Sequence, residues 1–243
     1  MRAWFSGSIA AVLIAAPVLA AGGSSFATLL TNADRPAADK ARDADRKPAE
    51  LMAFGGIKAG SVVAELAPGG GYYTRLLSLA VGPKGHVYSN SIRPAAAVQE
   101  WAASHSNTTM VIGLPTEPLA PVPVDVVWTT LNYHDFKNAK RDNGDAAGLY
   151  NKAAFAALKP GGVYLINDHY AATGAGASQT ATLHRIEDKI VISEVEAAGF
   201  KLQARSDMLR HAADDHTIKV LETGIRGKTD QFVLRFRKPK TTR

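Results

Sequence analysis

Two short stretches of the chain carry polar side chains that can move protons, LNYHDF at residues 131–136 and INDHY at residues 166–170. Histidine titrates near neutral pH and can take a proton from a hydroxyl or an amine, while a carboxylate beside it fixes which ring nitrogen carries hydrogen. Four of these side chains are therefore candidate catalytic residues: His134, Asp135, Asp168 and His169.

Two other roles fit the same side chains. An Asp-His pair that follows a strand often caps the next helix or ties down a turn. Two histidines and two aspartates at neighbouring strand ends could also hold a divalent cation. Because their spacing is not a metal-binding signature, we assign no metal ligands from the sequence.

A run of three glycines, Gly69–Gly71, follows an apolar segment in the stretch VVAELAPGGGYYT. In open α/β sheets, glycines at such a strand-to-helix junction let the backbone approach a ligand closely, and the N-terminus of the next helix points at the same crevice. The run therefore predicts a ligand-binding loop. The alternative is a tight turn that only packs the helix on the strand.

The elements that must position these residues follow from the pattern of apolar residues. Runs typical of strands occur at residues 62–67, 86–89, 109–112, 124–129, 163–166, 200–206 and 231–236. Helix-like stretches lie at residues 73–79, 95–104, 148–158 and 186–198. This alternation predicts an α/β fold with a doubly wound, mostly parallel, seven-stranded sheet. The last two strands have no long helix between them, which predicts an antiparallel strand at the C-terminal edge.

The pattern of residues also predicts the segments around this sheet. We expect a helical cap at residues 22–58, an α/β domain at 59–240, and loops at 137–145 and 171–178. The following residues could reach the crevice from outside the strand ends: Arg35 and Arg46 from the cap, His184 at the head of the fourth helix, and the late loop RHAADDHT at 210–217.

With its strand, acid and glycine-rich loop, VVAELAPGGGYYT resembles the first motif of the class I S-adenosylmethionine-dependent methyltransferases. ALKPGGVYLI at 157–166 and EVEAAGFKL at 194–202 are similar to later segments of that family, so the resemblance spans about residues 49–239. NYHDF and DQFVLRFRKP are similar to an exported bacterial subgroup of predicted methyltransferases. The resemblance implies S-adenosylmethionine as the cofactor, a Rossmann-like methyltransferase fold, and the following cofactor-binding residues: Glu65, Ala67, Gly69, Gly70, Gly71, Ser91 and Asn132.

The chain departs from the family pattern at two positions. The family usually has glycine where Ala67 stands, and an acid at the end of the second strand that holds both ribose hydroxyls. Here that strand ends in Ser89, Asn90 and Ser91. A serine or an asparagine gives one neutral hydrogen bond where a carboxylate gives two charged ones, so we expect weaker cofactor binding by roughly 1–3 kcal/mol.

Composition and the N-terminal residues indicate where the protein acts and which kinds of chemistry and partner are not expected. Residues 1–21 combine a positive start with a short apolar core and small residues, as in a cleaved signal, which predicts a periplasmic or secreted protein with no stable membrane insertion after cleavage. The chain has no cysteine, which excludes thiolate chemistry. Aromatic residues are only 7% and do not interleave with a basic face, so nucleic acid is not an expected partner.

These observations predict a methyltransferase that acts on a small molecule. The alternative is a catalytically inactive binding protein of the same fold in the periplasm, which the absent ribose acid favours. A different enzyme on the same sheet is a third possibility, because fold does not determine function.

Overall fold

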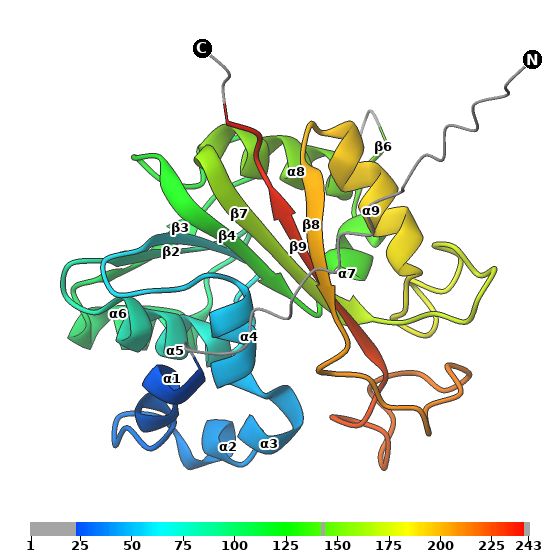
Figure 1. Ribbon diagram of the computed structural model, residues 1–243, viewed down its shortest axis with the longest axis horizontal. Coiled ribbons are helices and arrows are strands. Elements are labelled where there is room, and N and C mark those ends of the chain that lie inside the picture. Colours follow the sequence, from blue (N-terminus) through cyan, green and yellow to red (C-terminus); the bar gives the residue numbers. More distant parts are fainter. Residues whose placement is uncertain (1–22, 142–143, 241–243) are drawn as a thin grey trace, which may run out of the picture.

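The computed structural model describes residues 23–141 and 144–240, so the predicted signal at 1–21 lies outside the described residues. Its centre is a seven-stranded sheet in the order β3-β2-β1-β4-β7-β9-β8 (Figure 1). The strands are β1 (Val62–Leu66), β2 (His86–Ser91), β3 (Thr108–Ile112), β4 (Val124–Thr130), β7 (Leu158–His169), β8 (Lys201–Ser206) and β9 (Gln231–Arg237). Strands β1 to β4 and β7 pair in parallel, and β9 is antiparallel to both its neighbours. The predicted fold class is confirmed.

The last strand in sequence, β9, lies between β7 and β8, one position in from the edge. Its apolar residues Phe232, Val233 and Leu234 are each at most 1% exposed, which suits a strand covered on both faces. Strand β8 alternates between exposed and half-buried residues, as expected for a strand with one open side. The antiparallel pair at the C-terminal side of the sheet is therefore present, with β8 outermost.

Helices cover both faces of the sheet (Figure 1). One face carries α1 (Gly23–Leu30), α4 (Pro48–Phe54), α5 (Tyr72–Val81) and α6 (Ala96–Ser104), and the other carries α7 (Tyr133–Asn138), α8 (Ala146–Ala157) and α9 (Asp188–Ala197). Two single-turn helices, α2 (Ala37–Lys40) and α3 (Asp43–Arg46), join α1 to α4. None of the helices in the described ranges is long and apolar enough to cross a bilayer.

Two local predictions were wrong. The segment 137–145, expected as a loop, contains the end of α7 and a small antiparallel pair, β5 (Lys140–Arg141) and β6 (Gly144–Asp145). His184 does not lie at the head of a helix, because α9 begins four residues later at Asp188.

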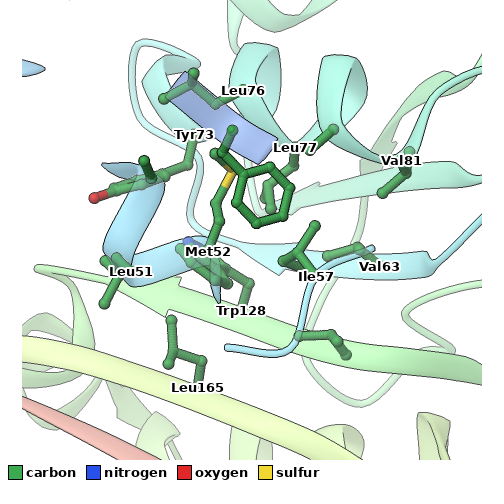
Figure 2. Close-up of a cluster of buried hydrophobic side chains, with 14 of the residues drawn as sticks. Leu51, Met52, Ile57, Val63, Tyr73, Leu76, Leu77, Val81, Trp128 and Leu165 are labelled. Atoms are coloured by element: carbon green, nitrogen blue, oxygen red, sulfur yellow. The ribbon is translucent and has the colours of Figure 1, made fainter. Parts of the chain in front are cut away.

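The N-terminal helices belong to the main hydrophobic core. Figure 2 shows Leu51 and Met52 of α4 against Trp128 of β4 and Leu165 of β7, and all four side chains are completely buried. The approach is close, because a Cβ added to Gly55 would lie 2.6 Å from the Trp128 ring. The predicted cap thus packs directly on the sheet that carries the candidate site.

The candidate site residues follow strand ends that lie side by side. Strands β1, β4 and β7 are consecutive in the sheet and parallel, so their carboxyl ends share one edge. The glycine loop follows β1 and helix α7 follows β4. Because ligand sites in open α/β sheets lie at this edge, the topology brings both predicted motifs to one place.

Candidate functional site

The glycine loop is fixed by one hydrogen bond within its turn and by a second from the Arg75 side chain. Its turn closes with the Gly71 amide donating to the Pro68 carbonyl at 2.9 Å. Arg75 of α5 donates through Nη2 to the Gly70 carbonyl at 2.8 Å, and its Nε lies 2.6 Å from Asp39 of α2. A Cβ added at Gly69 or Gly70 would meet no atom within 4 Å. The backbone of these two glycines therefore faces open space.

Ala67 stands where the resembled family has glycine, and its backbone explains that preference. Its φ is +54°, in the left-handed region that side-chain-bearing residues rarely adopt. The Ala67 amide donates to Asn90, and its carbonyl accepts from Nδ2 of Asn132 at 3.1 Å. Since Asn132 also donates to the Thr130 carbonyl at 2.6 Å, its amide group joins the β1 loop to the end of β4.

Glu65 is a buried carboxylate at the end of β1. Thr74 and Ser89 donate to the same oxygen of Glu65, at 2.6 and 2.7 Å. Burial raises the pKa of Glu65 to about 7, although these hydrogen bonds and nearby Arg75 oppose the rise. Glu65 therefore titrates near neutral pH, and a cation in the pocket would favour its charged form.

His134 and Asp168 form a buried pair across the ends of β4 and β7. Asp168 has no exposed surface, and one of its carboxylate oxygens lies 2.8 Å from His134 Nδ1. The other oxygen accepts the backbone amide of His134 at 2.8 Å, which supplies helix α7 with an N-terminal partner. Burial alone would lower the pKa of His134, but the Asp168 carboxylate holds it above its ordinary value. The pair keeps hydrogen on Nδ1, so that the lone pair is on Nε2 whenever the ring is neutral.

His169 is neutral and fixed by a different partner. Its Nδ1 lies 2.8 Å from the Thr229 hydroxyl, and the side chain is buried. Burial lowers the pKa of His169 to about 3, although Asp168 opposes this shift. His169 is therefore a weak base at neutral pH, and of the two predicted histidines His134 is better suited to accept a proton.

His184 joins the site from the loop before α9. The adjacent Arg185 is completely buried, makes two hydrogen bonds of 2.8 and 2.9 Å to Asp214, and so anchors this loop beside β7. His184 Nδ1 then lies 3.2 Å from His134 Nε2. Within the part of the chain that the structure describes, His134, Asp135 and His184 form a group of potential metal ligands whose atoms lie within 4.8 Å of one another.

One pocket of about 830 Å³ connects these groups. It contains eight of the predicted site residues: Glu65, Ala67, Gly69, Gly70, Asn132, His134, Asp135 and His169. The other three lie elsewhere. Asp168 is behind His134, Gly71 precedes α5 next to the Arg75 side chain, and Ser91 lines a separate hollow of about 10 Å³ with Asn90 and Glu117.

The mouth of the pocket is lined by parts of the chain far apart in sequence. Arg42, Asp45 and Arg46 come from the N-terminal segment, and Arg226 and Gly227 from the loop before β9. These segments touch, since a Cβ added to Gly227 would lie 3.0 Å from an Asp45 oxygen. Three arginines against one aspartate give this mouth an excess of positive charge.

Several lining residues were missed or only partly anticipated from the sequence. Arg46 and His184, which could reach the crevice according to the sequence, line the pocket, whereas Arg35 pairs with Asp43 inside the N-terminal segment at 2.7–2.8 Å. Missed lining residues are Arg42, Asp45, Tyr72, Tyr73, Val220, Leu221, Arg226, Gly227 and Gln231. For the lining residues between Val220 and Gly227, the nearest sequence signal was the polar loop at 210–217, which ends just before them.

Comparison with known proteins gives the fold. No protein-family model and no curated protein sequence matches this chain. Among solved structures, a SAM-dependent methyltransferase from Aquifex aeolicus has a TM-score of 0.59 at 16% identity, covering 89% of this chain and 98% of that one. Aeropyrum pernix fibrillarin, solved with natively bound S-adenosyl-L-methionine, has a TM-score of 0.50 at 15% identity, covering 77% and 73%.

A third protein of similar structure is named for a reaction other than methyl transfer. The cyclase SpnF has a TM-score of 0.60 at 14% identity, covering 81% of each chain. At these identities the likeness establishes the Rossmann-like methyltransferase fold and no more. Function has to be argued from the site itself.

Proposed function

We propose that this protein is an S-adenosylmethionine-dependent methyltransferase that acts on a small molecule. The observation that carries the proposal is a single pocket that joins the glycine loop after β1 to the His134–Asp168 pair after β4 and β7. Its volume of about 830 Å³ lies in the range of small-molecule sites. The bound S-adenosyl-L-methionine in fibrillarin, which shares the fold, supports this choice of cofactor.

The residues of the β1 loop fit the cofactor. Open space above Gly69 and Gly70 admits a ligand against bare backbone, as the motif requires. Glu65 places a titratable carboxylate where a cationic ligand would stabilise its charge. When bound, the cofactor supplies a methyl group on a positively charged sulfur. Ser91, outside this pocket, would give the ribose one neutral hydrogen bond at most.

The His134 side of the pocket suits the methyl acceptor. Asp168 aligns the imidazole so that Nε2 can accept a proton from an acceptor hydroxyl or amine. His169, held neutral beside it, is better placed to orient the acceptor than to deprotonate it. Methyl transfer needs little beyond alignment of the two reactants, and a single pocket that holds both would supply it.

Titration calorimetry of the purified protein with S-adenosylmethionine and S-adenosylhomocysteine tests this proposal. We expect micromolar binding that Gly70→Asp abolishes, because the new carboxylate projects into the pocket without straining the backbone. Gly148→Asp is the matched control. Gly148 is an exposed glycine in the first turn of α8, away from the pocket, and an added Cβ there also meets no atom within 4 Å.

The outcomes separate the possible functions. Binding that survives Gly70→Asp places the ligand elsewhere, and no binding at millimolar ligand rules out the methyltransferase. Binding without methyl transfer to any acceptor in a broad screen would leave a binding protein of this fold.

We also propose that the protein is exported and belongs to the bacterial subgroup that its NYHDF and DQFVLRFRKP segments resemble. The support is in the sequence alone, since residues 1–21 have the pattern of a cleaved signal. Determination of the N-terminus of the native protein tests the export. A start near Ala21 is expected, and an intact Met1 on the mature protein would contradict it.

A further inference from the structure

Three side chains on the acceptor side of the pocket each bring one potential metal-ligand atom to within 4.8 Å of the other two. The atoms that approach one another are Nε2 of His134, Nδ1 of His184 and one carboxylate oxygen of Asp135. The two nitrogens are 3.2 Å apart, and the oxygen lies 3.4 Å from each of them. The three atoms thus form a nearly equilateral triangle.

This triangle has the dimensions of one face of a tetrahedral metal site. Zinc binds histidine nitrogen and carboxylate oxygen at about 2.0–2.2 Å, and in a tetrahedron such bonds separate the ligand atoms by about 3.3–3.6 Å. Hydrogen bonding accounts for the 3.2 Å edge, and the two 3.4 Å edges are carboxylate–imidazole contacts longer than the usual N–H···O range of about 2.7–3.2 Å. One shared cation would account for all three edges together.

The surroundings hold the ligand atoms in this arrangement. Asp168 binds Nδ1 of His134 from the buried side, which is how carboxylates commonly orient a metal-binding histidine. His184 has a φ of +57°, a left-handed conformation uncommon outside glycine, and Arg185 next to it is fixed to Asp214. The chain therefore holds an unfavourable backbone conformation at the residue that completes the triangle.

We propose that His134, Asp135 and His184 bind one divalent transition-metal ion of the zinc type, with a fourth coordination position open to the pocket. Two histidines and one carboxylate with an open position are typical of catalytic zinc sites. All three residues line the pocket. The ion would lie where the acceptor is expected and not at the glycine loop.

The consequence for the acceptor rests on the proposed methyltransferase function. An acceptor hydroxyl that coordinates the ion loses its proton to water more readily, because the metal lowers its pKa. The oxygen lone pair then forms the bond to the methyl carbon as the carbon–sulfur bond breaks, and the sulfur product leaves neutral. His134 acts in this case as a metal ligand, and the acceptor class is a small molecule with a metal-coordinating hydroxyl group.

Metal titration of the full chain tests the site without cofactor or turnover. Protein stripped with a chelator is titrated with ZnCl₂ by calorimetry and with CoCl₂ by visible absorption. We expect one ion per chain and the intense bands of tetrahedral cobalt. His184→Asn and Asp135→Asn should each weaken zinc binding by at least about tenfold, since even partners that only orient a ligand cost about 10–100-fold.

His216→Asn is the matched control for His184→Asn. Both histidines have left-handed backbones, with φ of +65° and +57°, and side chains that are 22% and 23% exposed, while asparagine tolerates this conformation. His216 lies outside the triangle, so its replacement should leave zinc affinity unchanged. Absence of stoichiometric binding, or equal losses in His216→Asn and His184→Asn, would overturn the proposal. Neither result depends on S-adenosylmethionine binding, so the two proposals fail separately.

Discussion

His134 Nδ1 lies 2.8 Å from a carboxylate oxygen of Asp168, and this carboxylate has no exposed surface. The same carboxylate accepts the backbone amide of His134, so one buried aspartate fixes both the imidazole and the first turn of α7. The position and the orientation of the candidate catalytic histidine therefore depend on a residue that never faces the pocket.

Asp168→Asn should lower both the stability of the protein and the pKa of His134. The variant replaces a buried hydrogen bond to a charged carboxylate by one to a neutral amide, which costs roughly 1.5–3 kcal/mol, and the pKa of His134 should fall because the carboxylate that raises it is gone. Urea unfolding and an NMR titration of the imidazole measure the two effects. Asp135→Asn is the comparison, because that side chain is 49% exposed and its loss should destabilise far less. Equal losses in the two variants would show that burial of the pair contributes nothing.

Glu65 should make the protein less stable as pH rises from about 4.5 to about 7. Its pKa in the folded protein is about 7 against an ordinary 4.5, so in this window the folded state binds more protons than the unfolded state. The free energy of unfolding should therefore decrease with pH, by roughly 3 kcal/mol at most. Urea unfolding from pH 4 to 8 measures it, and Glu65→Gln should remove most of the slope. The exposed Glu117→Gln should keep it.

S-adenosylmethionine should bind more tightly as pH rises through about 7. Ionised Glu65 attracts a cationic ligand, and the ligand in turn compensates the cost of the buried charge. S-adenosylhomocysteine, whose sulfur is neutral, should show a weaker dependence. Calorimetry of both ligands at pH 6 and pH 8 measures the difference. A dependence that persists unchanged in Glu65→Gln would assign it to another group.

Ala67→Gly should be neutral or stabilising, although alanine-to-glycine changes usually destabilise. The φ of +54° at Ala67 costs about 1–2 kcal/mol for a side-chain-bearing residue, while the added freedom of glycine in the unfolded chain costs about 0.5–1 kcal/mol. Ala80→Gly, in helix α5, should instead destabilise by about 1 kcal/mol. Thermal unfolding of both variants tests the contrast, and equal losses would show that the loop carries no strain at Ala67.

Arg75→Gln should loosen both the glycine loop and the N-terminal helices. The guanidinium joins Asp39 to the Gly70 carbonyl, and its loss leaves the mostly buried Asp39 without its countercharge. We expect a loss of roughly 3 kcal/mol in stability and faster amide exchange at Gly71, whose amide closes the turn of the loop. Hydrogen exchange measures the second effect. If the loss comes from the unpaired charge, Arg75→Gln combined with Asp39→Asn should recover part of the stability.

The sequence by itself determined that the chain forms a seven-stranded sheet and where along the chain each strand lies, although β7 extends beyond the predicted 163–166 to Leu158–His169. Apolar runs with short spacing fixed all seven strands, because burial on a sheet face requires that pattern locally. The glycine run and the two polar motifs could be placed at one edge because parallel strands end together. Glu65, Gly69, Gly70 and His134 consequently line one pocket, as expected.

Only the tertiary structure decided which polar groups meet. His184 lies 50 residues from His134 in sequence, and its approach to 3.2 Å depends on the buried Arg185–Asp214 pair that anchors its loop. Arg46 and Arg226 likewise line the same pocket although they are far apart in sequence. Strand β9, the last in the chain, takes an inner position in the sheet that its place in the sequence does not predict. These contacts join distant segments, and their energies depend on burial and partner distance, which no local pattern of residues encodes.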